Sequence, residues 1–167
     1  MSQDPADCRI EYSPGARACE YVSYAWPPAG AVPSEWPLAP GAIRLGADGR
    51  PELLHFAPGR WLAPGAAPDS FHGSYEGATP PAGTLVDVSG KWDGVQLRGG
   101  GAARLLATTI DLERVLEQRD CAAVTLFDSP AIIVRVPDGY LLWVQSSYTS
   151  DFLTAAKRAR AVLEARR

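Results

Sequence analysis

The chain has 167 residues, which fits one domain better than two, since domains commonly contain roughly 100–200 residues. Hydrophobic residues make up 46% of the chain and charged residues 21%, as in an ordinary globular protein. The formal net charge is −3 and no basic block occurs, so the composition gives no electrostatic reason to expect nucleic acid as a partner.

Membrane and export signals are missing from the sequence pattern. The longest apolar run, Tyr140 to Val144, is far shorter than the roughly 20 residues that cross a bilayer. The acidic N-terminus lacks the basic and apolar regions of a secretory signal, so we expect a soluble protein of the cytoplasm. Cys8, Cys19 and Cys121 form no CxxC pair, and we expect them to be thiols in a reducing compartment.

The first half of the chain is rich in proline and glycine. Proline removes a backbone donor and fixes φ, so the stretches 26–40 and 58–81 should be irregular loops or arms, interrupted by short strands. The sequence thus predicts an irregular, Pro-rich N-terminal arm over residues 1–40 and a single α+β domain over residues 41–167. The short strands expected in this half are Ala18–Tyr24, Gly41–Leu45 and Leu53–Phe56.

Regular elements dominate from residue 83 onward. Thr84–Val88 is typical of a strand, and Trp92–Leu97 has the period-2 alternation of a half-buried strand. Gly99–Gly101 then interrupts the pattern. Two short helices are expected next, over Ala102–Thr108 and Asp111–Gln118, with Asp111 at the cap or first turn of the second.

The C-terminal third predicts an antiparallel meander followed by a long helix. Its apolar strands are separated by the turn sequences Asp128-Ser129-Pro130 and Pro137-Asp138-Gly139. The expected strands are Ala122–Phe127, Ala131–Val136 and Tyr140–Gln145. A helix from Thr149 or Ser150 to Ala165 places one apolar stripe against the core. This order predicts an α+β fold, a mainly antiparallel sheet covered on one face by helices.

Few residues indicate catalysis. His55 alternates with apolar neighbours in a short strand, where a packed or edge histidine is more typical than a base. His72 has no GxSxG nucleophile elbow near it, and the scattered Cys and His residues do not form a zinc pattern. Gly99–Gly101 fits a tight turn, with anion binding as an alternative. We therefore assign no catalytic, cofactor-binding or metal-binding residue, and keep an enzyme that uses Cys121 or His72 as a lesser alternative.

The five tryptophans fall into two groups, of which Trp61, Trp92 and Trp143 lie within regular elements and are expected in the core. Trp26 and Trp36 flank prolines in the irregular arm, where large apolar rings often anchor a partner contact, so both are candidate interface residues. In a second interpretation, Trp61, Trp92 or Tyr148 stacks on a flat ligand ring.

A family resemblance rests on three stretches of sequence. From residue 83, GTLVDVSGKWDGVQLRGGGAARLLATTIDL resembles a segment of sarcosine oxidase gamma subunits and their aminomethyltransferase-like relatives, in which an Asp-x-Ser strand, an alternating strand, a glycine turn and a short helix follow one another. The stretch from Leu126 to Val144 and the helix from Phe152 are similar to the C-terminal half of that module. Upstream, IRLGADGRPELLHFAPGRWLAPG is similar to its strand pair ending in tryptophan and leucine.

The resemblance implies a small, non-catalytic, gamma-like accessory subunit with a folate-binding-enzyme-like, or aminomethyltransferase-like, fold. It would dock on the large flavoprotein subunit of a heteromeric sarcosine oxidase-like enzyme that acts on N-methylated amino acids. This chain would then hold no cofactor, and the partner subunits would carry flavin, with folate as a further candidate. The alternative function is a free-standing binding protein for a folate-like small molecule.

Overall fold

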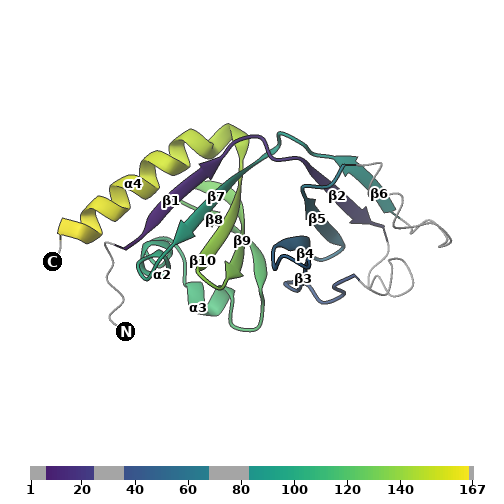
Figure 1. The fold of residues 1–167 in the computed structure, drawn as a ribbon, viewed down its shortest axis with the longest axis horizontal. Coiled ribbons are helices and arrows are strands. Elements are labelled where there is room, and N and C mark those ends of the chain that lie inside the picture. Colours follow the sequence, from purple (N-terminus) through teal and green to yellow (C-terminus); the bar gives the residue numbers. More distant parts are fainter. Residues whose placement is uncertain (1–6, 25–35, 68–82, 166–167) are drawn as a thin grey trace.

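The computed structural model describes residues 7–24, 36–67 and 83–165, which form two antiparallel sheets with a few helices (Figure 1). In the first sheet the strand order is β1-β7-β10-β9-β8, and in the second it is β3-β4-β5-β2-β6. The predicted α+β class is confirmed. The expectation of one sheet is corrected to two, because the strands of the Pro-rich half pair with one another instead of extending the C-terminal meander.

The element bounds are as follows. The first sheet contains β1 (Arg9–Ser13), β7 (Trp92–Arg98), β8 (Cys121–Leu126), β9 (Ser129–Val136) and β10 (Gly139–Gln145). The second sheet contains β2 (Ala18–Ser23), β3 (Ile43–Leu45), β4 (Pro51–Ala57), β5 (Arg60–Pro64) and β6 (Gly83–Asp87). The helices are α2 (Ala102–Leu106), α3 (Leu112–Val115), the 3-10 turn η2 (Ser146–Tyr148) and α4 (Thr149–Ala165).

The chain passes between the sheets twice. It leaves the first sheet after β1 to form β2, and it returns from β6 to β7, the strand that pairs with β1. The second sheet is therefore inserted between two neighbouring strands of the first. The sequence predicts an irregular arm over residues 1–40, but this segment contains two strands. Strand β1 belongs to the first sheet and β2 to the second.

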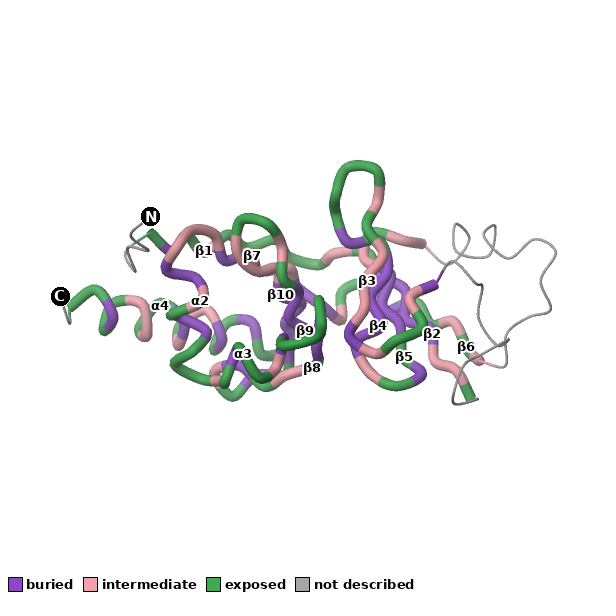
Figure 2. The backbone as a smooth tube through the Cα atoms, turned by 90° about the horizontal axis from the view of Figure 1, so that it is seen from below, coloured by how far each residue is buried: buried purple, intermediate pink, exposed green. Residues whose placement is uncertain are grey.

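Two apolar layers cover the first sheet. Its helix-facing side holds Leu97, Ile133 and Leu142 in one cluster, which α2 and α4 close, the latter with Phe152. Its opposite side packs on the second sheet, and this intersheet core includes the buried residues Leu54, Leu62, Trp92, Ile132 and Trp143. Figure 2 shows the buried residues gathered in the strands at the centre of both sheets, whereas the connecting turns are mostly exposed.

The predicted start of α3 and both predicted bounds of α4 agree with the structure, whereas α2 ends at Leu106 and α3 at Val115, before their predicted ends at Thr108 and Gln118. The side chain of Asp111 accepts a hydrogen bond from the backbone N–H of Arg114, which makes Asp111 the N-cap of α3. Helix α4 begins at Thr149 and ends at Ala165, as predicted, with Phe152, Ala156 and Leu163 buried. Across the described residues, no helix is long and apolar enough to cross a membrane.

The turn between β8 and β9 lies one residue earlier than predicted. Phe127 and Asp128 both have positive φ, at 48° and 59°, which is the backbone of a two-residue type I′ hairpin turn. Ser129 and Pro130 consequently belong to β9 and not to the turn. The aromatic ring of Phe127 contacts that of Phe152 edge to face at 5.5 Å, so a tertiary contact accompanies a backbone conformation that phenylalanine rarely adopts.

We expect Phe152→Ala to lower the free energy of unfolding by about 3–5 kcal/mol, because it leaves a cavity under α4 and removes the contact with Phe127. Denaturant titration measures the change. The control on the same helix is Val162→Ala, since the Val162 side chain is 49% exposed and its loss should cost less than about 0.5 kcal/mol. Equal costs for the two variants would contradict the packing of α4 described here.

Candidate functional site

The structure places Trp36 in an aromatic cluster on the outer face of the second sheet. Trp36 is only 4% exposed, and its ring lies 5.3 Å from that of Tyr21 and 5.6 Å from that of Trp61. The indole N–H of Trp61 donates to the carbonyl of Pro37 at 2.9 Å, which ties the segment after Trp36 to β5. Most of the Trp36 ring is therefore already in contact within the chain. Trp26 lies outside the described residues, and an interface role for both residues stays a prediction.

The three candidate stacking residues lie in three separate places. Trp61 is buried in the aromatic cluster, and Trp92 is buried in the intersheet core. Tyr148 lies in η2 before α4 and is 42% exposed. The structure does not bring them together into one binding site. Ligand stacking by any one of them stays a prediction.

His55 is a packed residue, as its sequence context predicts. It is fully buried in β4, and its ring stacks on that of Trp61 with centroids 4.1 Å apart and planes 19° from parallel. Burial lowers the pKa of His55, while the carbonyl groups of Pro37, Leu38 and Ala39 oppose that shift. The ring is thus held neutral as part of the core.

All three cysteines are free thiols and all are buried. Burial raises the pKa of Cys121 to about 12, with a smaller contribution from the Asp120 carboxylate. Burial also raises the pKa of Cys8 and of Cys19. Because the thiolate is the nucleophilic form of cysteine, these surroundings disfavour nucleophilic chemistry. No group of three or more His, Cys, Asp or Glu residues in the described ranges has the arrangement of a metal site.

A buried carboxylate in the second sheet gives no signal in the sequence. Glu20 on β2 is almost fully buried, and its carboxylate accepts hydrogen bonds from the guanidinium of Arg60, with Nε at 2.7 Å. Lys91, just before β7, donates to the other carboxylate oxygen at 3.2 Å. The cluster therefore joins β2, β5 and the connection that returns the chain to the first sheet. Its cations come from positions 40 and 71 residues away in the chain, so no local pattern reveals it.

A cavity of about 840 Å³ lies between the two sheets. Its lining includes Gln96, Arg98, Leu141 and Trp143 of the first sheet, and the β3–β4 turn closes the other side. The charged groups around it are already engaged, since Arg98 pairs with Glu11 and Asp138 at 3.4 Å each. The turn residues Arg50 and Asp48 likewise pair with each other. The Oε1 atom of Gln96 accepts a hydrogen bond from Arg98 at 3.0 Å, so this cavity offers an apolar wall and few free polar groups for a ligand.

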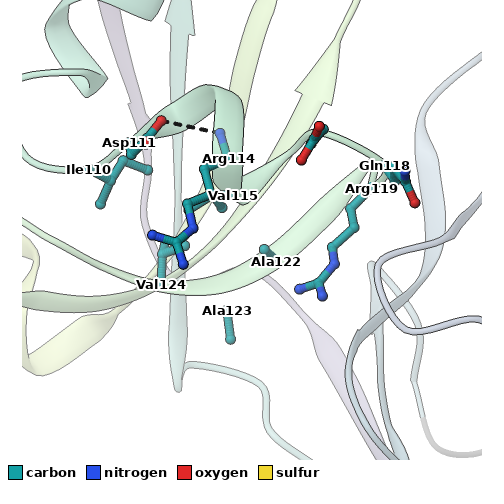
Figure 3. A pocket seen from close by; sticks show the side chains of 10 residues that line it. Ile110, Asp111, Arg114, Val115, Gln118, Arg119, Ala122, Ala123 and Val124 are labelled. Carbon is teal, nitrogen blue, oxygen red and sulfur yellow. Dashed lines mark hydrogen bonds between the residues drawn. The ribbon is translucent and has the colours of Figure 1, made fainter.

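A second hollow, of about 650 Å³, lies beside strand β8 at the edge of the first sheet. Figure 3 shows the side chains of Arg114 and Arg119 extending toward the strand that carries Ala122, Ala123 and Val124. Both arginines are exposed, and within the described part of the chain neither guanidinium forms an ion pair or hydrogen bond. The hydrocarbon stem of Arg119 packs on Gly41, where a Cβ atom would come within 2.6 Å of it. This hollow combines a strand edge with two unpaired cations.

Comparison with solved structures identifies the fold. The chain is similar to a chain of the heterotetrameric sarcosine oxidase from Corynebacterium sp. U-96, solved in complex with pyrrole 2-carboxylate. The TM-score is 0.72 and the identity 17%, covering 95% of this chain and 89% of that chain. A second match, to a protein from Agobacterium tumefaciens, covers 92% of this chain and 90% of that protein's chain at 11% identity. Its TM-score of 0.39 is too low to support an argument. No protein-family model and no curated protein matches the sequence. The chain thus shares its fold with a component of a heterotetrameric sarcosine oxidase.

We expect Glu20→Gln to lower the free energy of unfolding by about 1–3 kcal/mol, because the amide cannot accept charge-assisted bonds from both Arg60 and Lys91. Thermal or denaturant unfolding measures the loss. Glu52→Gln is the matched control, since the Glu52 side chain is 52% exposed and its pair with Arg44 should contribute less than about 1 kcal/mol. A Glu20 variant as stable as the Glu52 variant would show that the buried cluster contributes nothing.

Stability should fall as the pH drops below about 6.5, the ordinary pKa of histidine. The folded state holds His55 neutral with a lowered pKa, so the unfolded chain binds a proton that the folded chain does not. The loss attributable to His55 is at most about 1.4 kcal/mol for each pH unit. The free energy of unfolding, measured between pH 7.5 and pH 5, should depend less steeply on pH in His55→Phe than in the unsubstituted protein. The phenylalanine keeps a ring against Trp61. Identical slopes for the two proteins would exclude His55 as the cause.

Proposed function

We propose that this chain is a non-catalytic, gamma-like accessory subunit of a heteromeric, flavin-dependent oxidase that acts on N-methylated amino acids. The observation that carries the proposal is the likeness to a chain of a heterotetrameric sarcosine oxidase, with a TM-score of 0.72. The likeness extends over 95% of one chain and 89% of the other, so it involves the whole fold and not a shared motif. The resemblance in sequence from residue 83 onward supports the same role.

The titratable groups of the described residues support an accessory role. Cys121 is buried with a raised pKa, His55 is stacked in the core, and Glu20 is engaged by two cations. Each of these three groups is packed within the fold, and none of them lines either hollow. A subunit that docks on a catalytic partner needs no reactive group of its own. In this proposal the large flavoprotein partner carries the flavin and, as a further candidate, folate.

The intersheet cavity favours a second candidate function, the binding of a folate-like small molecule. Its volume of about 840 Å³ lies within the range of small-molecule sites, and Trp143 and Leu141 supply apolar surface for a flat ring. Quenching of tryptophan fluorescence by reduced folates would support this function. The absence of quenching at high ligand concentration would favour the accessory subunit.

Affinity purification of the tagged chain from its native host tests the proposed function. We expect a stoichiometric complex with a large subunit, flavin absorbance in the purified sample, and oxidation of sarcosine or another N-methylated amino acid. The same purification from cells that carry the untagged chain is the control. A tagged chain recovered as a stable monomer, without flavin absorbance and without a large partner, would contradict the proposal.

A further inference from the structure

The open edge of β8 has a defined set of unused hydrogen-bonding groups. Strand β9 is its neighbour on one side, and no strand in the described residues pairs with the other. The N–H of Arg135 on β9 donates to the carbonyl of Asp120 at 2.9 Å. Because antiparallel pairs alternate, the backbone groups of Ala122 and Val124 also face β9, and those of Cys121, Ala123 and Thr125 face away.

Among residues 7–24, 36–67 and 83–165, contacts cover only the beginning of this edge. The N–H of Cys121 donates to the carbonyl of Gly41 at 2.9 Å, which closes the first outward position. For Ala123 and Thr125, no backbone partner on the outward side exists within the described part of the chain, and both residues are exposed. The hairpin turn at Phe127 and Asp128 ends the edge. The edge thus offers the donors and acceptors of about two residues that a further strand could use.

Strand β8 lacks the features by which edge strands usually avoid pairing. Such strands commonly carry charged side chains, a proline or a bulge. The sequence of β8 is CAAVTL, without charge or proline, and its register with β9 is continuous. The small side chains of Ala122 and Ala123 also leave room beside the strand, in the hollow shown in Figure 3. An unprotected edge beside an open hollow is suited to receive a strand.

The charges around the hollow indicate the chemistry of that strand. Asp111 and Glu117 also line it, so its formal charge is balanced. The carboxylate of Asp111, however, is engaged as the cap of α3 by the N–H of Arg114 at 3.2 Å. The guanidinium groups of Arg114 and Arg119 instead extend over the strand in Figure 3. The cations that extend toward the edge are therefore these two arginines, whereas Asp120 and Asp128 flank its two ends.

We propose that the β8 edge binds an extended, acidic segment of a partner chain, which adds a strand to the first sheet and places carboxylates against Arg114 and Arg119. This inference rests on the proposed subunit role, because it names the kind of partner segment that the chain would hold. Main-chain hydrogen bonds to Ala123 and Thr125 supply affinity, and the two arginines supply selectivity for acidic side chains.

The test uses the full chain and a fluorescein-labelled peptide of alternating glutamate and valine residues, followed by fluorescence anisotropy. We expect the double variant Arg114→Glu/Arg119→Glu to weaken binding at least tenfold, and Glu117→Gln to strengthen it. The double variant Lys157→Glu/Arg158→Glu, at exposed positions on α4 outside this hollow, is the charge-matched control and should change the Kd less than twofold. A peptide with lysine in place of glutamate should bind at least tenfold more weakly.

Amide hydrogen exchange measured by NMR locates the contact. The amides of Ala123 and Thr125 should become protected when the glutamate–valine peptide binds, whereas those of Ala122 and Val124 are bonded to β9 throughout. No binding at millimolar peptide, equal binding of the lysine peptide, or unchanged exchange at Ala123 and Thr125 would each overturn the proposal. Protection of these two amides without peptide, together with a concentration-dependent dimer, would overturn it in favour of pairing between two copies.

The two proposals fail separately. A chain that copurifies with a flavoprotein but does not bind the acidic peptide overturns the edge site and leaves the subunit role standing. A chain that binds the peptide at Ala123 and Thr125 but has no flavoprotein partner in its host overturns the subunit role and leaves the edge site standing.

Discussion

Strand β9 is buried on both of its faces, and the arrangement of the other elements follows from that. Ala131 and Ile133 point to the helices, while Ile132 and Val134 point to the second sheet. Strand β10 repeats this division with Leu142 and Trp143, which lie opposite Ile133 and Ile132. An antiparallel sheet commonly leaves one face to water, but this one carries apolar residues on both. It therefore needs helices on one side and a second sheet on the other.

Because both faces of the first sheet are occupied, its free surface lies at its edges. Strand β1 forms one edge and β8 the other. The side chains of β1 are mostly polar and exposed, whereas β8 is small and apolar. The contact of Gly41 with Asp120 and Cys121 fixes the start of β8 against the second sheet. The rest of β8 is held in place by its pairing with β9 and by the tight hairpin after it, so its edge is already extended as a strand before any partner binds.

The sequence predicted the second half of the fold well because local chemistry decides it there. The cap at Asp111, the stripe on α4 and the alternation of Trp92–Leu97 each depend on near neighbours in the chain. Strand β1 has only Ile10 half-buried and is polar elsewhere, so it carries no hydrophobic pattern. Strand β5 lies between prolines and glycines, so its composition predicts a loop, and only the family resemblance, with a strand pair ending in tryptophan and leucine, indicates it. Its pairing with β2 and β4 stabilises it as a strand.

The candidate site was less accessible to sequence reasoning for a similar reason. Trp36 has the surroundings of an exposed arm in the sequence, but Tyr21 and Trp61 enclose it from strands that are distant in the chain. The hollow beside β8 exists because β8 is the edge strand of the first sheet. Strand order depends on the whole topology, so the local sequence does not indicate it. Arg114 and Arg119 are ordinary surface residues in the sequence, and only the strand order makes them neighbours of a free edge.

The insertion of the second sheet between β1 and β7 affects how the chain folds during synthesis. Strand β1 leaves the ribosome early, but the residue opposite Arg9 is Arg98, so its partner strand follows about ninety residues later. Contacts over such separations slow folding, and an unpaired strand is open to wrong association in the meantime. The polar character of β1 limits that risk, since the waiting strand exposes little apolar surface. The polar composition that gives β1 no hydrophobic pattern therefore also limits the apolar surface that this strand exposes while the rest of the first sheet is made.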